Sequence, residues 1–443
     1  MSVHNPRPAL LSLGLATLLA ALGSSIANVA LPTLVDAFAT TASAAQWVVL
    51  AYLLAITTLI VSAGRLGDLL GRKRVLIGGL LLFSAGSTCA ALAPTLALLL
   101  AARALQGLGA AAMMALPLAL VADSVGQAKA GQAMGMLGSL SAVGTALGPS
   151  LGGVLISHWG WRALFALCVP LALLAALLAW RYLPASSPAS RQRPDYRGTL
   201  LLGVTLAAYA LAMTSTPLLF VPAIFGAVLF VRQQRQTSAP LLQLTLFKDG
   251  ARVRALLMSA LVAAVMMSTL VVGPFYLSTG LALKASAIGL VMAAGPAMAA
   301  ISGVPAGQLT DRFGVQRTLR AGLLMMALAC LLLVLMASRM AVAGYIGPLL
   351  LMTAGYSLFQ TANNTAVMAG GDTTQRGALS GVLNLARNLG LITGASALGA
   401  VFISASAATD AAHGLRVSFA VALALVLAAL ASSVRPQAAA NAT

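Results

Sequence analysis

Long apolar stretches separated by short polar segments fill almost the whole chain. A helix needs about 20 apolar residues to cross the roughly 30 Å hydrocarbon core of a bilayer. On that criterion we predict fourteen membrane-spanning helices, with boundaries uncertain by several residues, at residues 10–32, 46–63, 75–93, 96–121, 134–156, 163–182, 198–214, 217–231, 255–277, 287–306, 318–337, 342–367, 379–404 and 415–434. The seventh and eighth are the shortest. If that pair did not cross the membrane, the count would be twelve, and the termini would stay on the same side.

Composition supports this membrane assignment. The 443 residues are 60% hydrophobic and 8% charged, whereas a soluble domain carries roughly a quarter charged residues. We therefore predict an all-α polytopic membrane protein. The net charge of +18 would suit nucleic acid, but the basic residues are spread through loops that face anionic lipid. Membrane lipids are the expected partner, and nucleic acid is not.

The distribution of Lys and Arg predicts the orientation. With the N-terminus in the cytoplasm, all but six of the 26 basic residues fall in inner loops. Four fall outside (Arg162, Lys284, Arg339, Arg416) and two lie within spans (Arg103, Arg387). The positive-inside rule therefore places both termini in the cytoplasm of a multi-pass protein of a bacterial inner membrane.

A short basic segment with one acid, Gly64–Arg74, recurs in weaker form as Gly307–Arg317. The offset is constant at 243 positions: Gly64, Leu66, Asp68, Gly71 and Arg74 reappear as Gly307, Leu309, Asp311, Gly314 and Arg317, whereas Arg65 and Arg72 occur in the first copy only. Glycines permit tight turns and close helix approach. Matching loops in two hydrophobic halves are typical of secondary transporters.

Through these loops the chain resembles the major facilitator superfamily along nearly its whole length. Two extra central spans make it resemble the fourteen-span drug–proton antiporter branch. The resemblance implies two six-helix bundles, residues 1–183 and 255–443, and linkers over 184–254 that hold a two-span hairpin at about 198–231. It also implies that the repeated loops gate movement, with Asp68 bound to a helix N-terminus or to an Arg. The alternative is a solvated turn whose charges only set topology.

Two further segments match this family. Arg103 and Gln106 lie on one face of the fourth span, and the family attributes proton transfer to this Arg; the alternative is an Arg that packs helices by binding backbone carbonyls. Asp123, at the inner end of that span, is the best remaining candidate proton carrier, and His158 and His413 near the outer face are alternatives that could titrate near neutral pH. The fifth span carries a glycine-rich pattern that resembles the antiporter motif of exporters: Gly144, Gly148, Pro149, Gly152 and Gly153.

Two polar stripes in the C-terminal half predict a cavity wall. Gln360, Asn363 and Asn364 follow helical spacing on the twelfth span, and Asn384, Arg387 and Asn388 repeat it on the thirteenth. Polar residues in spans face a bundle interior or an aqueous cavity, although interhelical hydrogen bonding is the alternative. In the N-terminal half the facing wall would hold Ser25, Asn28, Tyr52 and Gln106.

One departure from the antiporter branch affects the predicted mechanism. The first span has Gly23 where that branch has an Asp, the chain contains no Glu, and its eight Asp fall in loops or at span ends. A mid-membrane carboxylate is therefore missing, which favours a neutral or anionic substrate over a cation.

We predict export of small amphipathic molecules or drugs by alternating access, coupled to protons, by a monomer. The alternative is an exporter or facilitator for one neutral or anionic metabolite without that coupling. The sequence offers neither a Walker-type phosphate loop nor a cluster of catalytic or metal-binding side chains. We therefore expect no enzyme activity, no cofactor and no metal.

Overall fold

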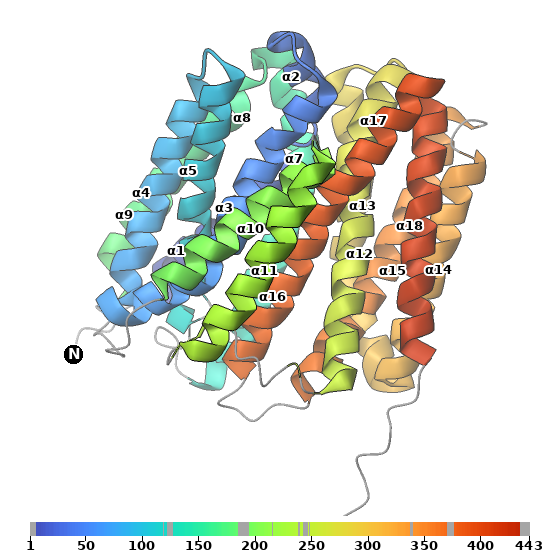
Figure 1. Cartoon of the computed structure of the whole chain (residues 1–443). Helices are drawn as coiled ribbons and strands as arrows, with labels where there is room; N and C mark the ends of the chain where they lie inside the picture. Colours follow the sequence, from blue (N-terminus) through green and yellow to red (C-terminus); the bar gives the residue numbers. More distant parts are fainter. Residues whose placement is uncertain are drawn as a thin grey trace, which may run out of the picture. The chain divides into compact units, whose positions relative to one another are not determined.

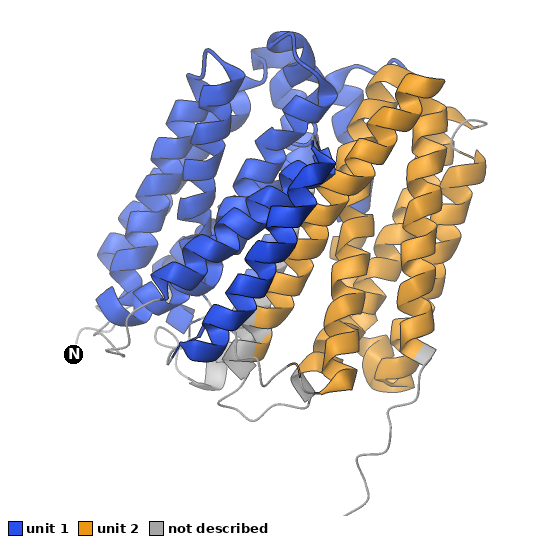
Figure 2. Ribbon diagram, viewed as in Figure 1, with its two compact units in different colours: residues 1–241, 282–296 blue, residues 242–281, 297–443 orange. Residues whose placement is uncertain are grey.

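The computed structural model describes residues 6–117, 119–121, 127–184, 195–214, 216–237, 240–241, 247, 249–336, 340–369 and 376–434. Every regular element in these residues is a helix (Figure 1). The chain divides into two compact units, drawn in separate colours in Figure 2. Unit 1 comprises residues 1–241 and 282–296, and unit 2 comprises residues 242–281 and 297–443.

Unit 1 contains the helices of the N-terminal half and the central hairpin. Their bounds are α1 Pro6–Ser25, α2 Leu31–Ala37, α3 Ala42–Leu70, α4 Arg72–Ala91, α5 Leu96–Ala115, α7 Gln127–Trp159, α8 Arg162–Ala166, α9 Cys168–Tyr182, α10 Tyr196–Thr214, the 3₁₀ turn η1 Pro217–Leu219 and α11 Phe220–Gln236. Within this unit α1 packs against α7 and α9, α5 against α3 and α4, and α10 against α11 and α3.

Unit 2 contains α12 Gly250–Phe275, the π-helical turn η3 Tyr276–Gly280, α14 Val315–Met336, α15 Ala341–Ala369, α16 Arg376–Thr393, the π-helical turn η4 Gly394–Leu398, α17 Gly399–Ala408 and α18 Ala411–Val434. Here α12 packs against α16 and α18, and α14 against α15 and α18. Helix α13, Ala285–Phe313, contributes its first part to unit 1 and the remainder to unit 2.

The helices agree with the predicted spans. Thirteen helical stretches in the described residues are long and apolar enough to cross a membrane, including both members of the central hairpin, 196–214 and 217–236. The predicted fifth span, 134–156, lies in α7, which is 33 residues long. Helices are the expected form because hydrocarbon offers backbone N–H and C=O groups no other partner. The count is therefore consistent with fourteen spans.

The first span is shorter than predicted, because regular helix ends at Ser25 rather than continuing to residue 32. Residues 26–30 form a series of turns, and Asn28 Nδ2 donates to the backbone oxygens of Ser24 and Ser25 at 3.1 and 3.2 Å. Pro32 then stands in the first turn of α2. Proline has no N–H to donate and suits a helix start, which explains a new helix at this point.

The two halves share a packing detail that extends the sequence repeat. Gly79 of α4 and Gly322 of α14 are separated by the same 243 positions as the repeated loops. A methyl group added at Gly79 would lie 2.9 Å from the Gly109 oxygen of α5, and one at Gly322 would lie 2.6 Å from the Gly355 oxygen of α15. Each glycine therefore permits backbone contact with the next long helix of its own half.

Candidate functional site

Each repeated segment consists of a helix end, one glycine and a helix start. Helix α3 continues through Leu70, Gly71 has φ of 94°, and α4 begins at Arg72. In the second copy Gly314, with φ of 83°, separates α13 from α14. The predicted loops are thus largely helical, and the tight turn needs a single glycine in each copy. The leading glycines, Gly64 and Gly307, lie within helices, and an added methyl group would meet nothing within 4 Å.

The charged side chains of the first copy bind within unit 1. Asp68 Oδ1 accepts from Arg72 Nε at 3.0 Å across the Gly71 turn. Both side chains are about one-third exposed, so the pair contributes ~0–1 kcal/mol. Arg65 donates to the Pro240 carbonyl, after α11. In the second copy, Asp311 and Arg317 are exposed, as is Arg74 in the first.

Arg103 of α5 lies fully buried inside unit 1, in a cage of neutral groups. Its Nε donates to the Val48 oxygen and its Nη2 to the Gly23 oxygen, each at 2.9 Å. Nη1 donates to Gln106 Oε1, which confirms that these two side chains share a helix face. The Tyr52 ring lies under the guanidinium, with 4.2 Å from Cζ to the ring centroid. Charge-assisted hydrogen bonds and cation–π stacking stabilise this cation without a carboxylate.

The missing first-span Asp bears directly on this cage. Position 23 contributes its backbone oxygen to Arg103. A methyl group added at Gly23 would lie 2.7 Å from Tyr52 Oη and 3.0 Å from Tyr52 Cζ. The Tyr52 hydroxyl, which donates to the Ala20 oxygen at 2.7 Å, is thus held over position 23. An aromatic ring occupies the space that an acidic side chain here would need.

The four candidate cavity residues of unit 1 are buried, each at most 1% exposed: Ser25, Asn28, Tyr52 and Gln106. Gln106 Nε2 donates to Ser87 Oγ at 2.8 Å. In the structure, Tyr52 and Gln106 therefore hold Arg103. Asn28 keeps a side-chain oxygen for which the described residues provide no hydrogen-bond donor.

The two polar stripes of unit 2 come together. Gln360, Asn363 and Asn364 of α15 line one small cavity with Arg387 of α16 and with Ser259 and Tyr356. Its volume is about 10 Å³, room for a single water molecule. Arg387 Nη2 donates to Asn384 Oδ1 at 2.7 Å. Arg387 is only partly buried, and Asn388 is 9% exposed.

The glycines of α7 permit close contact with α1. A methyl group added at Gly144 would lie 2.3 Å from the Leu18 oxygen, and one at Gly148 would lie 2.0 Å from Ser25 Oγ. Gly152 faces Val29 in the same way. Gly153, with Pro149 inside the helix, faces the first part of α13: a methyl at Gly153 would lie 2.8 Å from Gly289 Cα.

Unit 2 contains a matching glycine pair that sequence reasoning missed. Methyl groups added at Gly390 and Gly394 would lie 2.1 and 2.2 Å from the oxygens of Ala260 and Ala264 in α12. Their four-residue spacing equals that of Gly144 and Gly148, and that spacing was the available signal.

The Asp residues in the described part of the chain lie at or near helix ends. Three of them cap helix N-termini: Asp195 accepts from Gly198 N, Asp249 from Ala251 N and Asp410 from His413 N. Asp195 also accepts from Gln234 Nε2 of α11 at 2.7 Å. The candidate carrier Asp123 lies outside the described residues.

Comparison with known proteins identifies the family. The model of the Major Facilitator Superfamily matches residues 13–395. The chain is 33% identical over 415 residues to the multidrug resistance protein Stp of Mycobacterium tuberculosis strain CDC 1551 / Oshkosh, which covers 91% of this chain and 77% of Stp. It is 30% identical over 404 residues to the multidrug efflux pump LfrA of Mycolicibacterium smegmatis, covering 89% and 80% of the two chains.

The fold agrees with these sequence matches. The crystal structure of the peptide transporter POT in complex with sulfate superimposes with a TM-score of 0.74 at 15% identity, covering 95% of this chain and 93% of the other. Because the family model matches most of the chain and a relative at 33% identity covers 91% of it, this chain belongs to the major facilitator superfamily.

Proposed function

We propose that this protein exports small amphipathic molecules or drugs across a bacterial inner membrane by alternating access. The observation that carries this proposal is the similarity, along about nine-tenths of the chain, to proteins named for multidrug resistance and efflux. The glycine face of α7 supports it, because this is the segment that resembles the antiporter motif of exporters. The distribution of Lys and Arg supports cytoplasmic termini.

The polar cluster of α15 and α16 is our candidate for substrate contact. Arg387 and the amides of Gln360, Asn363 and Asn364 lie around one cavity, and Arg387 is held by Asn384. A guanidinium accompanied by amides offers hydrogen bonds to neutral and anionic groups and repels cations. We expect the repeated turns at Gly71 and Gly314 to gate the cytoplasmic side, with the protein acting as a monomer.

Proton coupling is part of the proposal, but it lacks the usual carrier. In the described residues Arg103 has neutral partners, and position 23 provides only a carbonyl. Asp123 remains our candidate carrier. The alternative function, export or facilitation of one neutral or anionic metabolite without proton coupling, is favoured by this lack of a mid-membrane carboxylate.

Liposomes with a trapped pH-sensitive dye separate the two functions. Purified protein would receive cationic, neutral and anionic compounds under an imposed pH gradient. Substrate-dependent proton flux that D123N abolishes would support coupled export. Uptake of a labelled compound without proton flux would support the uncoupled alternative.

The same assay tests the proposed substrate site. R387Q should reduce transport, whereas R181Q, which removes an exposed charge in the last turn of α9, should preserve it. If expression in a pump-deficient host changed neither drug resistance nor dye retention, export of amphipathic compounds would be refuted.

A further inference from the structure

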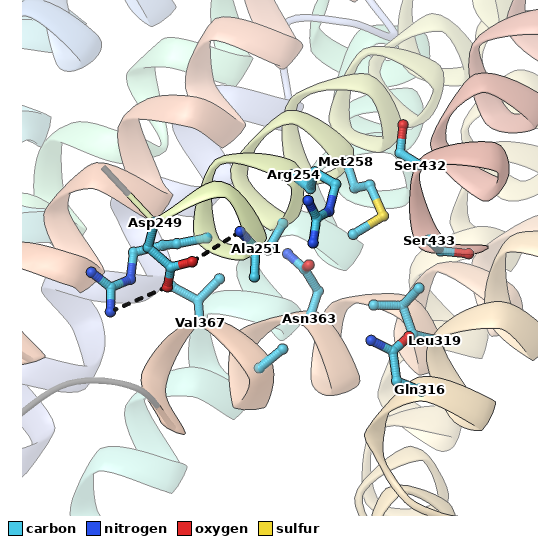
Figure 3. A pocket seen from close by; sticks show the side chains of 13 residues that line it. Asp249, Ala251, Arg254, Met258, Gln316, Leu319, Asn363, Val367, Ser432 and Ser433 are labelled. Atoms are coloured by element: carbon cyan, nitrogen blue, oxygen red, sulfur yellow. Dashed lines mark hydrogen bonds and ion pairs between the residues drawn. The ribbon is translucent and has the colours of Figure 1, made fainter. Parts of the chain in front are cut away.

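A second, larger cavity lies within unit 2, at the ends of α12, α14, α15 and α18. Its volume is about 300 Å³, at the small end of the range for ligand sites. The polar lining residues are Asp249, Arg252, Arg254, Gln316, Asn363 and the pair Ser432 and Ser433. Figure 3 shows Arg254 of α12 and Asn363 of α15 pointing toward one another in this space.

The charge in this cavity is positive and only partly balanced. Asp249 Oδ2 lies 3.8 Å from Arg252 Nη2, so these two charges offset each other. Asp249 Oδ1 also accepts from the Ala251 N–H at 2.9 Å. Arg254 has no hydrogen-bond or ion-pair partner in the part of the chain that the structure describes. Arg320, which donates to the Ser433 backbone oxygen at 3.1 Å, adds positive potential nearby. An anion would therefore be stabilised beside Arg254.

Asn363 supplies the second, independent indication of a ligand. Its side chain is 1% exposed, and its Oδ1 atom is buried without a hydrogen-bond donor among the described residues. A buried acceptor left unpaired costs about 1–3 kcal/mol. A ligand that brings its own N–H or O–H donor would remove that cost. The hydroxyls of Ser432 and Ser433 already donate to the backbone of α18, so they can only accept.

The ligand must therefore be compact, carry an anionic group for Arg254, and present a donor to Asn363. A phosphate ester with an ammonium or hydroxyl group satisfies all three requirements. The cavity also lies at helix ends on the side that our charge distribution assigns to the cytoplasm, where the phosphates of anionic lipids lie.

We propose that this cavity binds a phosphate ester that carries its own hydrogen-bond donor, with Arg254 holding the phosphate and Asn363 Oδ1 accepting from the donor. The ester can come from a phospholipid headgroup or from a soluble phosphoester. Asn363 also lines the small cavity beside Arg387, so the two sites share this one residue, but binding of the ester rests on Arg254 and does not require export.

The test measures thermal unfolding of the full chain, delipidated in a neutral detergent. The added probes are short-chain phosphatidylethanolamine, phosphoethanolamine, sulfate as an anion without a hydrogen-bond donor, and short-chain diacylglycerol, which has no phosphate. We expect a saturable rise in Tm with the first two and none with diacylglycerol. If phosphatidylethanolamine and phosphoethanolamine raise Tm at similar concentrations, a soluble phosphoester is sufficient to fill the cavity. If only phosphatidylethanolamine raises Tm, the ligand is a phospholipid headgroup.

Variants link the effect to the cavity. R254Q should weaken binding at least about tenfold, because a charge-assisted contact is lost, whereas R312Q, which removes an exposed charge from the same unit, should bind normally. N363L should remove the preference for phosphoethanolamine over sulfate, an anion that has no hydrogen-bond donor at neutral pH. Ligand-free Tm and elution volume establish that each variant is folded.

The proposal is overturned if no phosphoester raises Tm, or if R254Q and R312Q weaken binding equally. A preference for phosphoethanolamine that survives in N363L would refute the role of Asn363. Loss of drug transport would not affect these readouts, so failure of the export proposal can be distinguished from failure of this one.

Discussion

Restoring the missing acid, by Gly23→Asp, should destabilise the protein unless Tyr52 is also removed. The Cβ atom of the new side chain would lie 2.7 Å from Tyr52 Oη and 3.0 Å from Cζ, against 3.4–4 Å for ordinary contact. Overpacking of this kind costs about 1–3 kcal/mol. The attraction of the carboxylate to Arg103 is opposed by the desolvation of both charges, so it does not reverse the sign.

A double-mutant cycle isolates this clash. Tyr52→Ala alone should cost about 3–5 kcal/mol, since it removes a buried aromatic ring and its stacking on Arg103. In the G23D/Y52A double variant the obstruction is gone, and we expect a favourable coupling energy of about 1–3 kcal/mol. The free energy of unfolding would be measured by SDS titration in mixed micelles.

Tyr345→Ala provides the matched control for this cycle. Tyr345 is also fully buried and its hydroxyl donates to a backbone oxygen, that of Thr269 at 3.3 Å. It belongs to unit 2, whereas Gly23 belongs to unit 1, so its effect should add to that of G23D within about 0.5 kcal/mol. If the effects of G23D and Y52A also added within about 0.5 kcal/mol, the argument that Tyr52 occupies the space of the acidic side chain would be wrong.

Three other sets of variants test the glycines and the buried cation. Gly71→Ala should lower the free energy of unfolding by about 1 kcal/mol or more, because the φ of 94° at this position is unfavourable for a residue with a side chain. Gly64→Ala, whose added methyl group would meet nothing within 4 Å, should leave stability unchanged or raise it by up to about 1 kcal/mol. Thermal melts of the two variants test this difference. Gly148→Ala should impair transport because a methyl group would lie 2.0 Å from Ser25 Oγ. Ser25→Gly should restore transport in part only, because the backbone N of Ile26, at 2.9 Å, stays in place; a complete lack of recovery in liposomes would contradict the role of the Ser25 side chain. Arg103→Leu should destabilise the protein, because each buried oxygen left without its donor costs about 1–3 kcal/mol. Arg103→Lys should cost less, since one ammonium can still satisfy part of the cage; equal losses in SDS titration would contradict this.

The agreement between sequence and structure follows helical geometry. Spans were predictable because apolar length alone decides whether a helix can cross a bilayer. The Arg103–Gln106 contact was predictable because residues three apart share a helix face. The same periodicity does not say which helix lies opposite, so the carbonyls of Gly23 and Val48 that hold Arg103 could not be predicted.

The sites that were missed depend on contacts between segments far apart in the chain. Arg65 binds the Pro240 carbonyl, 175 positions away, and Arg254 faces Asn363 of another helix. By contrast, the helix cap at Asp195 was available from sequence, because an Asp directly before a helical segment is a local signal. Long-range partners of charged side chains therefore account for most of what the sequence left open.

The neutral cage of Arg103 has an electrical consequence. A guanidinium whose described partners are two carbonyls, one amide and two aromatic rings remains a net positive charge within the membrane. The membrane potential acts on such a charge with about 2.3 kcal/mol per 100 mV for a full crossing. A transport step that carried Arg103 through a tenth of that field would gain or lose about 0.2 kcal/mol per 100 mV. The turnover rate would then depend on voltage even when the substrate is uncharged and no proton moves.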